Sequence, residues 1–526
     1  MTLSSSMILV DQTAVPLATA EVIADLGGGV ADGQWILTAN ILPLAALMVF
    51  GGRLGDLLGL RRVFLAGAFT FMGATAVAGG AQDLPMMIAA RAVQGTGAAL
   101  MMPTAVAMTS AVFPGDQRGR ALGILAGGSA FFAALGPVLG GLLTSIDWRL
   151  VFLVNVPLAA ITVLLTLSAT PPLRPEGDTK PRIDYRGTLT FGLSIAALVF
   201  GLSQVQADGW DSPSTVIPLA AALALLVAFV LIELRTTSGL LDFRLFRHLN
   251  FLAANLSQLL AGAIELGLGF LLPFYLLLVI GIDPATAGIA LIPATIPIVL
   301  AGPLAGRAFD RIGGRIPLVV GYLVLAASGL ALAAGAGEQT VGALIPGLVL
   351  QGMGLGVVLT VNDPTGLGAV PPDAQGTAAG TINTTEQLGG ALGIAGLSAI
   401  EVGVAERITY ERLRDRGIDP SPEQIDRFKE FILQAAEAGR GQTPVDSRVV
   451  RLALEDNLLA HVDSFRITFL TSVGIALVGA VACFVLVRRE DRFYRGPVFG
   501  RRSRWVWAHA GASPAVTRHP PPGRDD

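Results

Sequence analysis

Charged residues, cysteine and aromatic residues are all scarce in this sequence. Only 14% of its 526 residues are charged, against about 25% in an ordinary soluble domain, and 6% are aromatic. The low charge excludes a set of soluble domains and a disordered chain. The single cysteine, Cys483, excludes a framework of internal disulfides. No basic domain interleaves with aromatic residues, so nothing favours binding to nucleic acid.

Apolar residues and glycine are abundant instead. The chain is 52% apolar and contains 64 glycines, and its mean hydropathy is +0.65. A membrane-spanning helix needs about 20 mostly apolar residues, so this composition predicts an all-α polytopic membrane protein. We expect fourteen spans, near residues 3–26, 34–54, 62–81, 84–112, 119–145, 149–168, 187–205, 215–234, 251–279, 286–308, 316–336, 342–362, 375–400 and 465–487.

The placement of arginine predicts the orientation of the spans. Alternate loops are rich in arginine, and basic residues favour the cytoplasmic side. These loops and the tail predict that both termini are cytoplasmic, and the preference for arginine over lysine suggests a bacterial cell membrane. The charged segment 403–463 then lies on the outer side, and we expect the basic tail 489–526 to be disordered.

Three sequence patterns recur in the same order about 255 residues apart, an offset read directly from the sequence. GRLGDLLGLRR at 52–62 returns as GRAFDRIGGRI at 306–316, QGTG at 94–97 returns as QGMG, and FPGDQRGRALG returns as VPPDAQGTAAG. An even number of predicted spans separates the copies, so the repeat is parallel. Such pairs of bundles work by alternating access around a central site. The predicted organisation is an N-terminal six-helix bundle (1–168), inserted helices 7 and 8 with linkers (169–249), a C-terminal six-helix bundle (250–488) and the tail.

These motifs resemble those of the major facilitator superfamily, over essentially all of the chain. The segment 52–62 is similar to its loop signature, RAVQGTG at 91–97 to its fourth-helix motif, and GPVLGG at 136–141 to its fifth-helix antiporter motif. Fourteen spans, DQTAV at 11–15 and WRLVFLVNVP at 148–157 indicate the fourteen-helix drug:proton antiporter branch, of the multidrug efflux type. The resemblance implies two six-helix bundles related by a pseudo-twofold axis, with two inserted helices.

Three acidic residues stand deepest inside the predicted spans, where a charge is costly and marks a functional candidate. Asp11 lies about 15 Å into the first span and Glu265 about 21 Å into the ninth. Each precedes the aspartate of its repeated loop by the same number of residues, so the two occupy matching positions. Glu386 lies about 16 Å into the thirteenth span. A carboxyl in a low-dielectric cavity exchanges protons near neutral pH and attracts cations, so we expect all three in proton coupling or substrate binding.

Arg91 is the basic candidate, about 10 Å inside the fourth span. Its counterpart in the second half is Leu348, whereas the neighbouring Gln94 is duplicated. By resemblance, Arg91 assists proton transfer by tuning a nearby carboxylate; the alternative is a structural bond to backbone or to an acid of the first span. In the fifth span we expect an antiporter motif that kinks the helix and packs it tightly, at Gly136, Pro137, Gly140 and Gly141.

The duplicated loops predict a cytoplasmic gate. Carboxylates and guanidiniums at helix ends can latch two halves together in one state and part in the other. The alternative is that these charges serve only to orient the chain in the membrane. The predicted gate residues are Gly52, Asp56, Gly59, Arg61, Arg62, Asp310, Gly313 and Arg315.

Several functional classes lack their motifs. The sequence has no phosphate-binding loop, HExxH motif or cysteine–histidine cluster, so we expect no enzymatic activity, no cofactor and no metal site. The expected function is a secondary active transporter that exports hydrophobic or cationic small molecules in exchange for protons, working as a monomer among membrane lipids. The alternatives are a dedicated exporter of a natural product, lipid or siderophore, a symporter or uniporter, and a membrane sensor that transports nothing.

Overall fold

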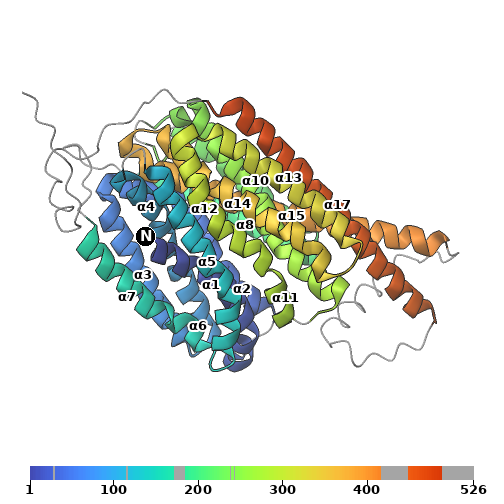
Figure 1. Cartoon of the computed structure of the whole chain (residues 1–526). Helices are drawn as coiled ribbons and strands as arrows, with labels where there is room; N and C mark the ends of the chain where they lie inside the picture. Colours follow the sequence, from blue (N-terminus) through green and yellow to red (C-terminus); the bar gives the residue numbers. More distant parts are fainter. Residues whose placement is uncertain are drawn as a thin grey trace, which may run out of the picture.

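The computed structural model describes residues 1–27, 30–113, 117–170, 184–236, 239–241, 243–282, 284–415 and 448–488. In these residues the chain is almost wholly helical and contains no strand. The helices run side by side in one elongated bundle (Figure 1).

The first group of helices packs within itself. Its most extensive contacts join α1 to α5, and α4 to both α2 and α3. The bounds are α1 (Thr2–Leu26), α2 (Val30–Leu58), α3 (Leu60–Gly79), α4 (Leu84–Val112), α5 (Arg118–Thr144), α6 (Arg149–Leu153) and α7 (Asn155–Ala169).

The second group repeats this arrangement. Here α10 packs along α15, and α13 packs along α14 and α17. The bounds are η1 (Phe243–Arg247), α10 (Leu249–Phe274), the π-helical η2 (Tyr275–Ile280), α11 (Pro284–Ala290), α12 (Ile292–Ile312), α13 (Arg315–Ala336), α14 (Val341–Gly368), η3 (Pro372–Ala374), α15 (Gln375–Asp415) and α17 (Arg448–Leu486).

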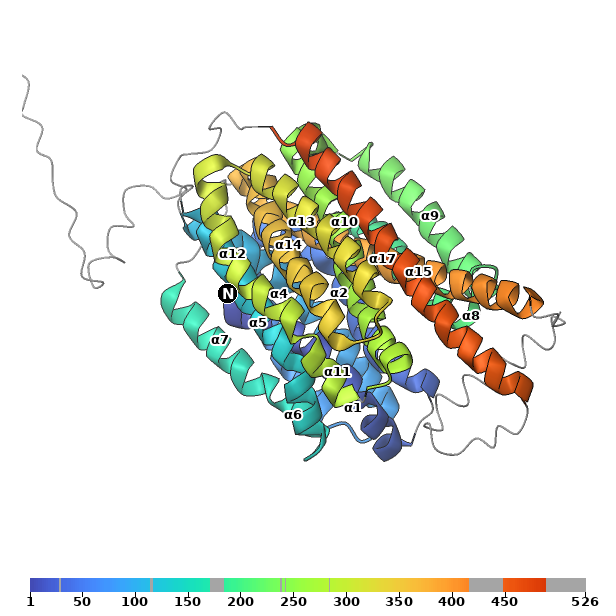
Figure 2. The same cartoon turned by 45° about the vertical axis from the view of Figure 1, so that its right-hand side comes forward.

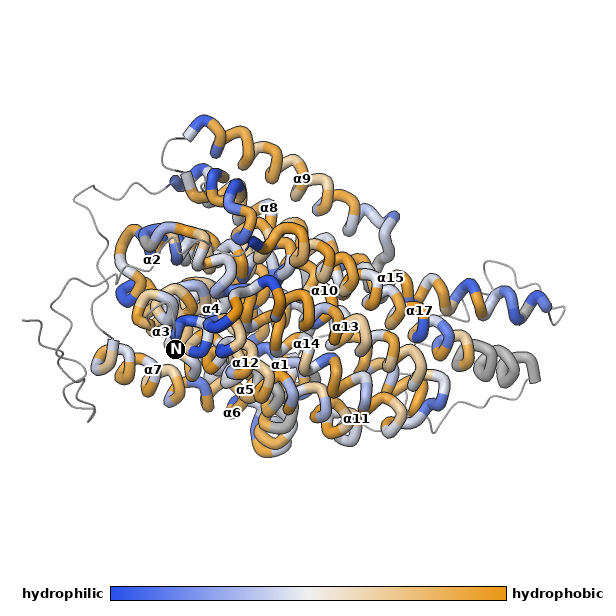
Figure 3. Tube along the Cα trace, turned by 45° about the horizontal axis from the view of Figure 1, so that its top comes forward, coloured by the Kyte–Doolittle hydropathy of each residue, from blue (hydrophilic) through white to orange (hydrophobic). Residues whose placement is uncertain are grey.

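Two further helices, α8 (Tyr185–Asp208) and α9 (Pro213–Glu233), lie between the groups in sequence and pack against each other. Helix α8 contacts both α2 of the first group and α15 of the second. Helix α9 lies outermost (Figure 2) and is hydrophobic along most of its length (Figure 3), as expected of a helix that faces lipid.

Twelve helical segments of the described residues are long and apolar enough to cross a membrane. They match twelve of the predicted spans. The other two predicted spans, the first and the fifth, are the long helices α1 and α5, which are not among the twelve. The all-helical fold is therefore confirmed, while the count of fourteen spans stays a prediction.

Helices extend into the predicted outer segment 403–463. Helix α15 continues to Asp415, α17 begins at Arg448, and both project beyond the rest of the bundle (Figure 1). Across the two helices Arg412 pairs with Asp463 at 2.8 Å. Residues 416–447 and the predicted disordered tail 489–526 lie outside the described residues.

Local signals for helix ends are duplicated along with the helices. Asp83 caps α4 by accepting a hydrogen bond from the Met86 N–H, and Thr340 caps the matching helix α14. Gly59 and Gly313 occupy matching turns with φ of 100° and 79°. Only glycine adopts such backbone angles without strain, which explains why both repeated loops keep it.

Close helix packing predicts a stability difference between two glycines of the first bundle. A Cβ on Gly95 of α4 would collide with the backbone oxygen of Asn40, whereas one on Gly73 of α3 meets nothing within 4 Å. Gly95→Ala should cost about 1–3 kcal/mol through overpacking, while Gly73→Ala should be neutral or stabilising because alanine favours helix. The apparent Tm in detergent measures both, and equal Tm values for the two variants would contradict the packing.

Candidate functional site

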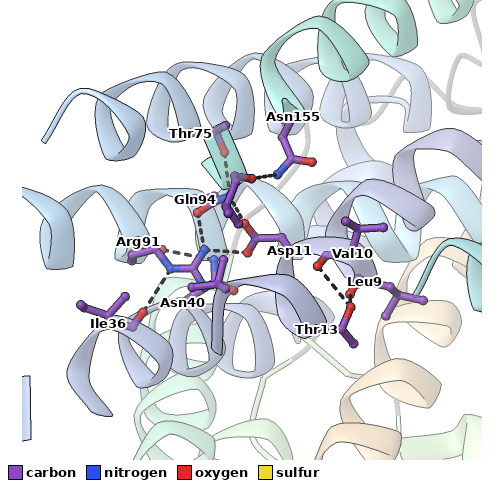
Figure 4. A network of polar contacts seen from close by, with 12 residues as sticks. Leu9, Val10, Asp11, Thr13, Ile36, Asn40, Thr75, Arg91, Gln94 and Asn155 are labelled. Carbon is purple, nitrogen blue, oxygen red and sulfur yellow. Dashed lines mark hydrogen bonds and ion pairs between the residues drawn. The ribbon is translucent and has the colours of Figure 1, made fainter. Parts of the chain in front are cut away.

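Asp11 and Arg91 form a buried ion pair at the junction of α1 and α4. The distance from Arg91 Nη1 to Asp11 Oδ2 is 2.6 Å. The Arg91 side chain is 2% exposed and the Asp11 side chain 1%. Gln94, one turn along α4, donates from Nε2 to the second Asp11 oxygen at 3.0 Å and accepts from Arg91 Nη1 at 2.7 Å. The three side chains face one another in Figure 4. Both carboxylate oxygens of Asp11 therefore have donors.

The Arg91 network reaches the neighbouring helices. Arg91 Nε donates to the Ile36 carbonyl of α2 at 3.1 Å, and Gln94 Nε2 also donates to Thr75 of α3 at 2.6 Å (Figure 4). One ion pair thus connects four helices of the first bundle. A buried charge that loses its partner is strongly destabilising, so a proton that neutralises Asp11 would change the forces among these helices.

The other two predicted acids, Glu265 on α10 and Glu386 on α15, lie close enough to interact electrostatically. Glu386 accepts a hydrogen bond from Gln258 Nε2 at 2.6 Å, and Gln258 in turn accepts from Asn362 of α14 at 2.6 Å. Oε2 of Glu265 is buried without a hydrogen-bond partner.

Sequence reasoning missed a third acid here, Asp363 of α14, which interacts electrostatically with Glu386. Asp363 lies five residues before the end of α14, where an acid is usually solvated, so its depth alone does not mark it. A carboxylate inside an apolar run is the signal that identifies it.

Asp56, a predicted gate residue at the end of α2, joins the two bundles. Its carboxylate accepts hydrogen bonds from the backbone N–H groups of Gly376 and Thr377, each at 2.7 Å, and from the Thr377 hydroxyl at 2.6 Å. These groups open α15, so an acid of the first bundle caps a helix of the second. Helix N-termini favour negative charge and have unpaired N–H groups, which Asp56 satisfies.

Asp310 makes the equivalent contact from the second bundle to the first. Its carboxylate accepts from the backbone N–H groups of Gly119 and Arg120, at 2.9 and 3.1 Å, at the start of α5. Gly119 and Gly376 hold matching positions in the repeat that indicated the duplication. The repeat thus contains both partner segments, although nothing in the sequence pairs them with the two aspartates. We call this end of the bundle, where Asp56 and Asp310 lie, the Asp56 end.

The remaining predicted gate residues lie around these two contacts. A Cβ on Gly52 would collide with the Gly376 backbone, so the two bundles approach closely there. Arg61 donates to the Leu167 carbonyl of its own bundle at 2.8 Å. Arg315 stacks over Phe484 of its own bundle at 4.4 Å, and Arg62 is exposed. The carboxylates thus bridge the bundles, while Arg61 and Arg315 contact their own halves.

The predicted antiporter motif packs α5 against α1. A Cβ on Gly136 would collide with Thr13, and one on Gly140 would press on the Ala14 backbone, whereas one on Gly141 meets nothing within 4 Å. The side chain of Pro137 lies outside the described residues. Two of the three glycines are therefore needed for close packing.

Comparison with known proteins establishes the family. The chain belongs to the Major Facilitator Superfamily, whose sequence model matches residues 1–394, and it is therefore a multi-pass membrane transporter of that family. The puromycin resistance protein pur8 of Streptomyces alboniger is 34% identical over 79% of this chain and 82% of its own length. The tetracenomycin C resistance and export protein of Streptomyces glaucescens is 32% identical over 93% and 91%.

Another relative is the multidrug resistance protein Stp of Mycobacterium tuberculosis, 28% identical over 91% of this chain and 88% of its own. Solved structures show the same fold at low identity. The human organic anion transporter MFSD10 (TETRAN) has a TM-score of 0.57 at 16% identity, covering 92% of this chain and 98% of its own. A bacterial homolog of the human lysosomal transporter Spinster, inward-facing and unoccupied, has a TM-score of 0.56 at 16% identity, covering 93% and 95%.

Disruption of the buried ion pair should be strongly non-additive. Arg91→Leu leaves the Asp11 carboxylate buried without its cation, which typically costs about 3–5 kcal/mol. The double variant Asp11→Asn/Arg91→Leu removes both charges and should recover part of that loss. A double-mutant cycle on apparent Tm in detergent measures the coupling, and simple additivity of the two single effects would rule it out.

Removal of the Asp56 contact should loosen the junction between the bundles. The reporter is a cysteine introduced by Thr381→Cys in a Cys483→Ala background. Thr381 lies one turn beyond Thr377 on α15 and is only 7% exposed, so a cysteine there should react slowly while the junction holds. Asp56→Ala should accelerate its reaction with a thiol reagent several-fold, because three hydrogen bonds are lost. Asp211→Ala, an exposed acid in the α8–α9 turn, is the control. Equal labelling rates for the two variants would show that Asp56 does not hold the junction.

Proposed function

We propose that the protein exports hydrophobic or cationic small molecules from a bacterial cell in exchange for protons. The buried Asp11–Arg91 pair carries this proposal, since a charge pair inside a membrane bundle is costly and typically functional. The named relatives support export as the direction, because their names describe resistance, multidrug resistance and export.

Asp11 is the proposed proton site. Protonation removes its negative charge and weakens the bond to Arg91, whose other contacts hold α4 to α2. Deprotonation restores the pair. The energy difference between the two states is set by Arg91, whose guanidinium stays charged throughout. Proton binding thereby changes how stably α1, α2 and α4 pack together. Alternating access requires such a shift in the relative stability of two conformations.

The Asp56 end is the proposed cytoplasmic gate. Both carboxylates bind helix N-termini across the bundles, which supports a closed state at this end. Export then alternates between this state and one in which the two contacts part. Arginine-rich loops support a cytoplasmic location for this end and for both termini, in the bacterial cell membrane.

A dedicated exporter of one natural product is the second candidate. Its support lies in relatives named for single compounds, tetracenomycin C among them. The two candidates share the proton-coupled mechanism and differ in the breadth of substrates, so one assay separates them.

Proton flux in inside-out vesicles tests the proposal. An imposed pH gradient is followed with a fluorescent dye while a panel of cationic and neutral compounds is added. Substrates should release protons with the wild type and should fail with Asp11→Asn. Asp83→Asn is the matched control, because Asp83 is an exposed helix cap and asparagine caps equally well.

Proton release that persists with Asp11→Asn would remove Asp11 from the coupling path. Release by a single compound class would favour the dedicated exporter. If folded protein releases protons with no compound, multidrug antiport fails for that panel.

A further inference from the structure

The two bundles carry matching polar positions inside the membrane. Asp11 of α1 corresponds to Glu265 of α10, and Gln94 of α4 corresponds to Gln351 of α14. In the first bundle these side chains are hydrogen-bonded. In the second bundle Oε2 of Glu265 and Oε1 of Gln351 are buried without any hydrogen-bond partner.

The difference between the bundles is one guanidinium. Arg91 binds both the carboxylate and the glutamine oxygen in the first bundle, and its counterpart in the second is Leu348, a fully buried apolar residue. The second bundle therefore has the acceptors of the Arg91 network and lacks its donor. A buried acceptor without a donor costs free energy, so an atom with N–H groups is favoured there.

A third unpartnered oxygen lies about 16 Å further along α14 than Gln351. Asn362 is 0% exposed, and its Oδ1 has no partner although its amide group donates to Gln258. Gln351 is only 4% exposed. The unpartnered atoms of Glu265, Gln351 and Asn362 are all oxygens, so a ligand that satisfies them must bring hydrogen-bond donors.

Charge gives the same indication. Among the described residues, no ion pair joins Glu265, Asp363 or Glu386 to a basic side chain, as the ion pairs of the chain involve other acids. Both Glu265 and Asp363 interact electrostatically with Glu386. Neighbouring carboxyls in a low-dielectric interior require protons or a cation to coexist.

We propose that Glu265 and Gln351 bind the protonated amine of the exported compound, in the place that the Arg91 guanidinium takes in the first bundle. Glu386 supplies further negative charge beside Glu265, and Asp363 in turn lies near Glu386. The proposal rests on export as the function and names the substrate class: lipophilic compounds with a primary or secondary ammonium group. A quaternary ammonium lacks N–H donors and satisfies only the charge.

Equilibrium binding to the purified full-length protein in detergent tests this site. The probes are dansylcadaverine, a fluorescent primary amine, and a small panel of other lipophilic amines, each paired with its neutral N-acetyl derivative. Binding is followed by fluorescence polarisation or by competition. The amines should bind about tenfold or more tightly than their acetylated partners, as a charge-assisted hydrogen bond predicts.

Two variants locate the amine. Glu265→Gln keeps the shape and removes the charge, and it should abolish the preference for amine over acetylated probe. Leu348→Arg supplies the missing guanidinium and should exclude amines while leaving acetylated probes bound. Glu338→Gln, at an exposed acid between α13 and α14, is the matched control and should bind like the wild type. If Leu348→Arg does not fold, Glu265→Gln decides the question.

The proposal is overturned if no amine binds more tightly than its acetylated partner, or if the preference survives Glu265→Gln. A pH dependence that changes with Glu265→Gln, without any change in amine preference, would make Glu265 a proton site only and would also overturn it. Because binding in detergent needs no gradient, the result is independent of coupling. Amine binding through Glu265 without proton release in vesicles would retain this site and reject antiport.

Discussion

The contact of an aspartate with a helix N-terminus across the bundles is the constraint on which the architecture depends. It occurs twice, from Asp56 to α15 and from Asp310 to α5. Each contact needs a turn with positive φ after the helix that carries the aspartate, and glycine where the backbones meet. Gly59 and Gly52 provide these in the first copy. A carboxylate suits this role because its bond to backbone N–H groups is strong yet reversible.

Comparison of the two halves separates scaffold from function. Positions that set backbone approach are retained in both, as with Gly136 and Gly393, each of which packs against the first helix of its own bundle. Positions that carry charge within the membrane differ, as with Arg91 and Leu348. The two halves thus keep a common frame of close helix contacts and differ at the buried charge of Arg91, which only the first half has.

Much of the fold follows from the sequence. Hydropathy locates the spans, and the nearly constant separation of the repeated motifs shows which helices of the two halves correspond. The site follows less fully. Asp56 was identified as a gate residue from its motif, but its partners are backbone N–H groups of α15, which no pattern of side chains reveals. Gln94 resembles a scaffold residue because it is duplicated, yet it binds Asp11. The helical extension of α15 to Asp415 is polar, so hydropathy indicates the apolar span but not the end of the helix.

The inserted helices make the two seams between the bundles unequal. Helix α8 lies across the seam of α2 and α15, with α9 outside it, and Phe191 and Phe229 pack there among apolar side chains of both bundles. In the described part of the chain, no helix from outside the bundles lies in the same way over the seam of α5 and α12. In the described residues, two helices therefore stand outside the seam of α2 and α15, and none stands in the same place at the seam of α5 and α12. A compound dissolved in the bilayer would therefore meet two different flanks of the molecule, an asymmetry that the twofold symmetry of the bundles does not predict.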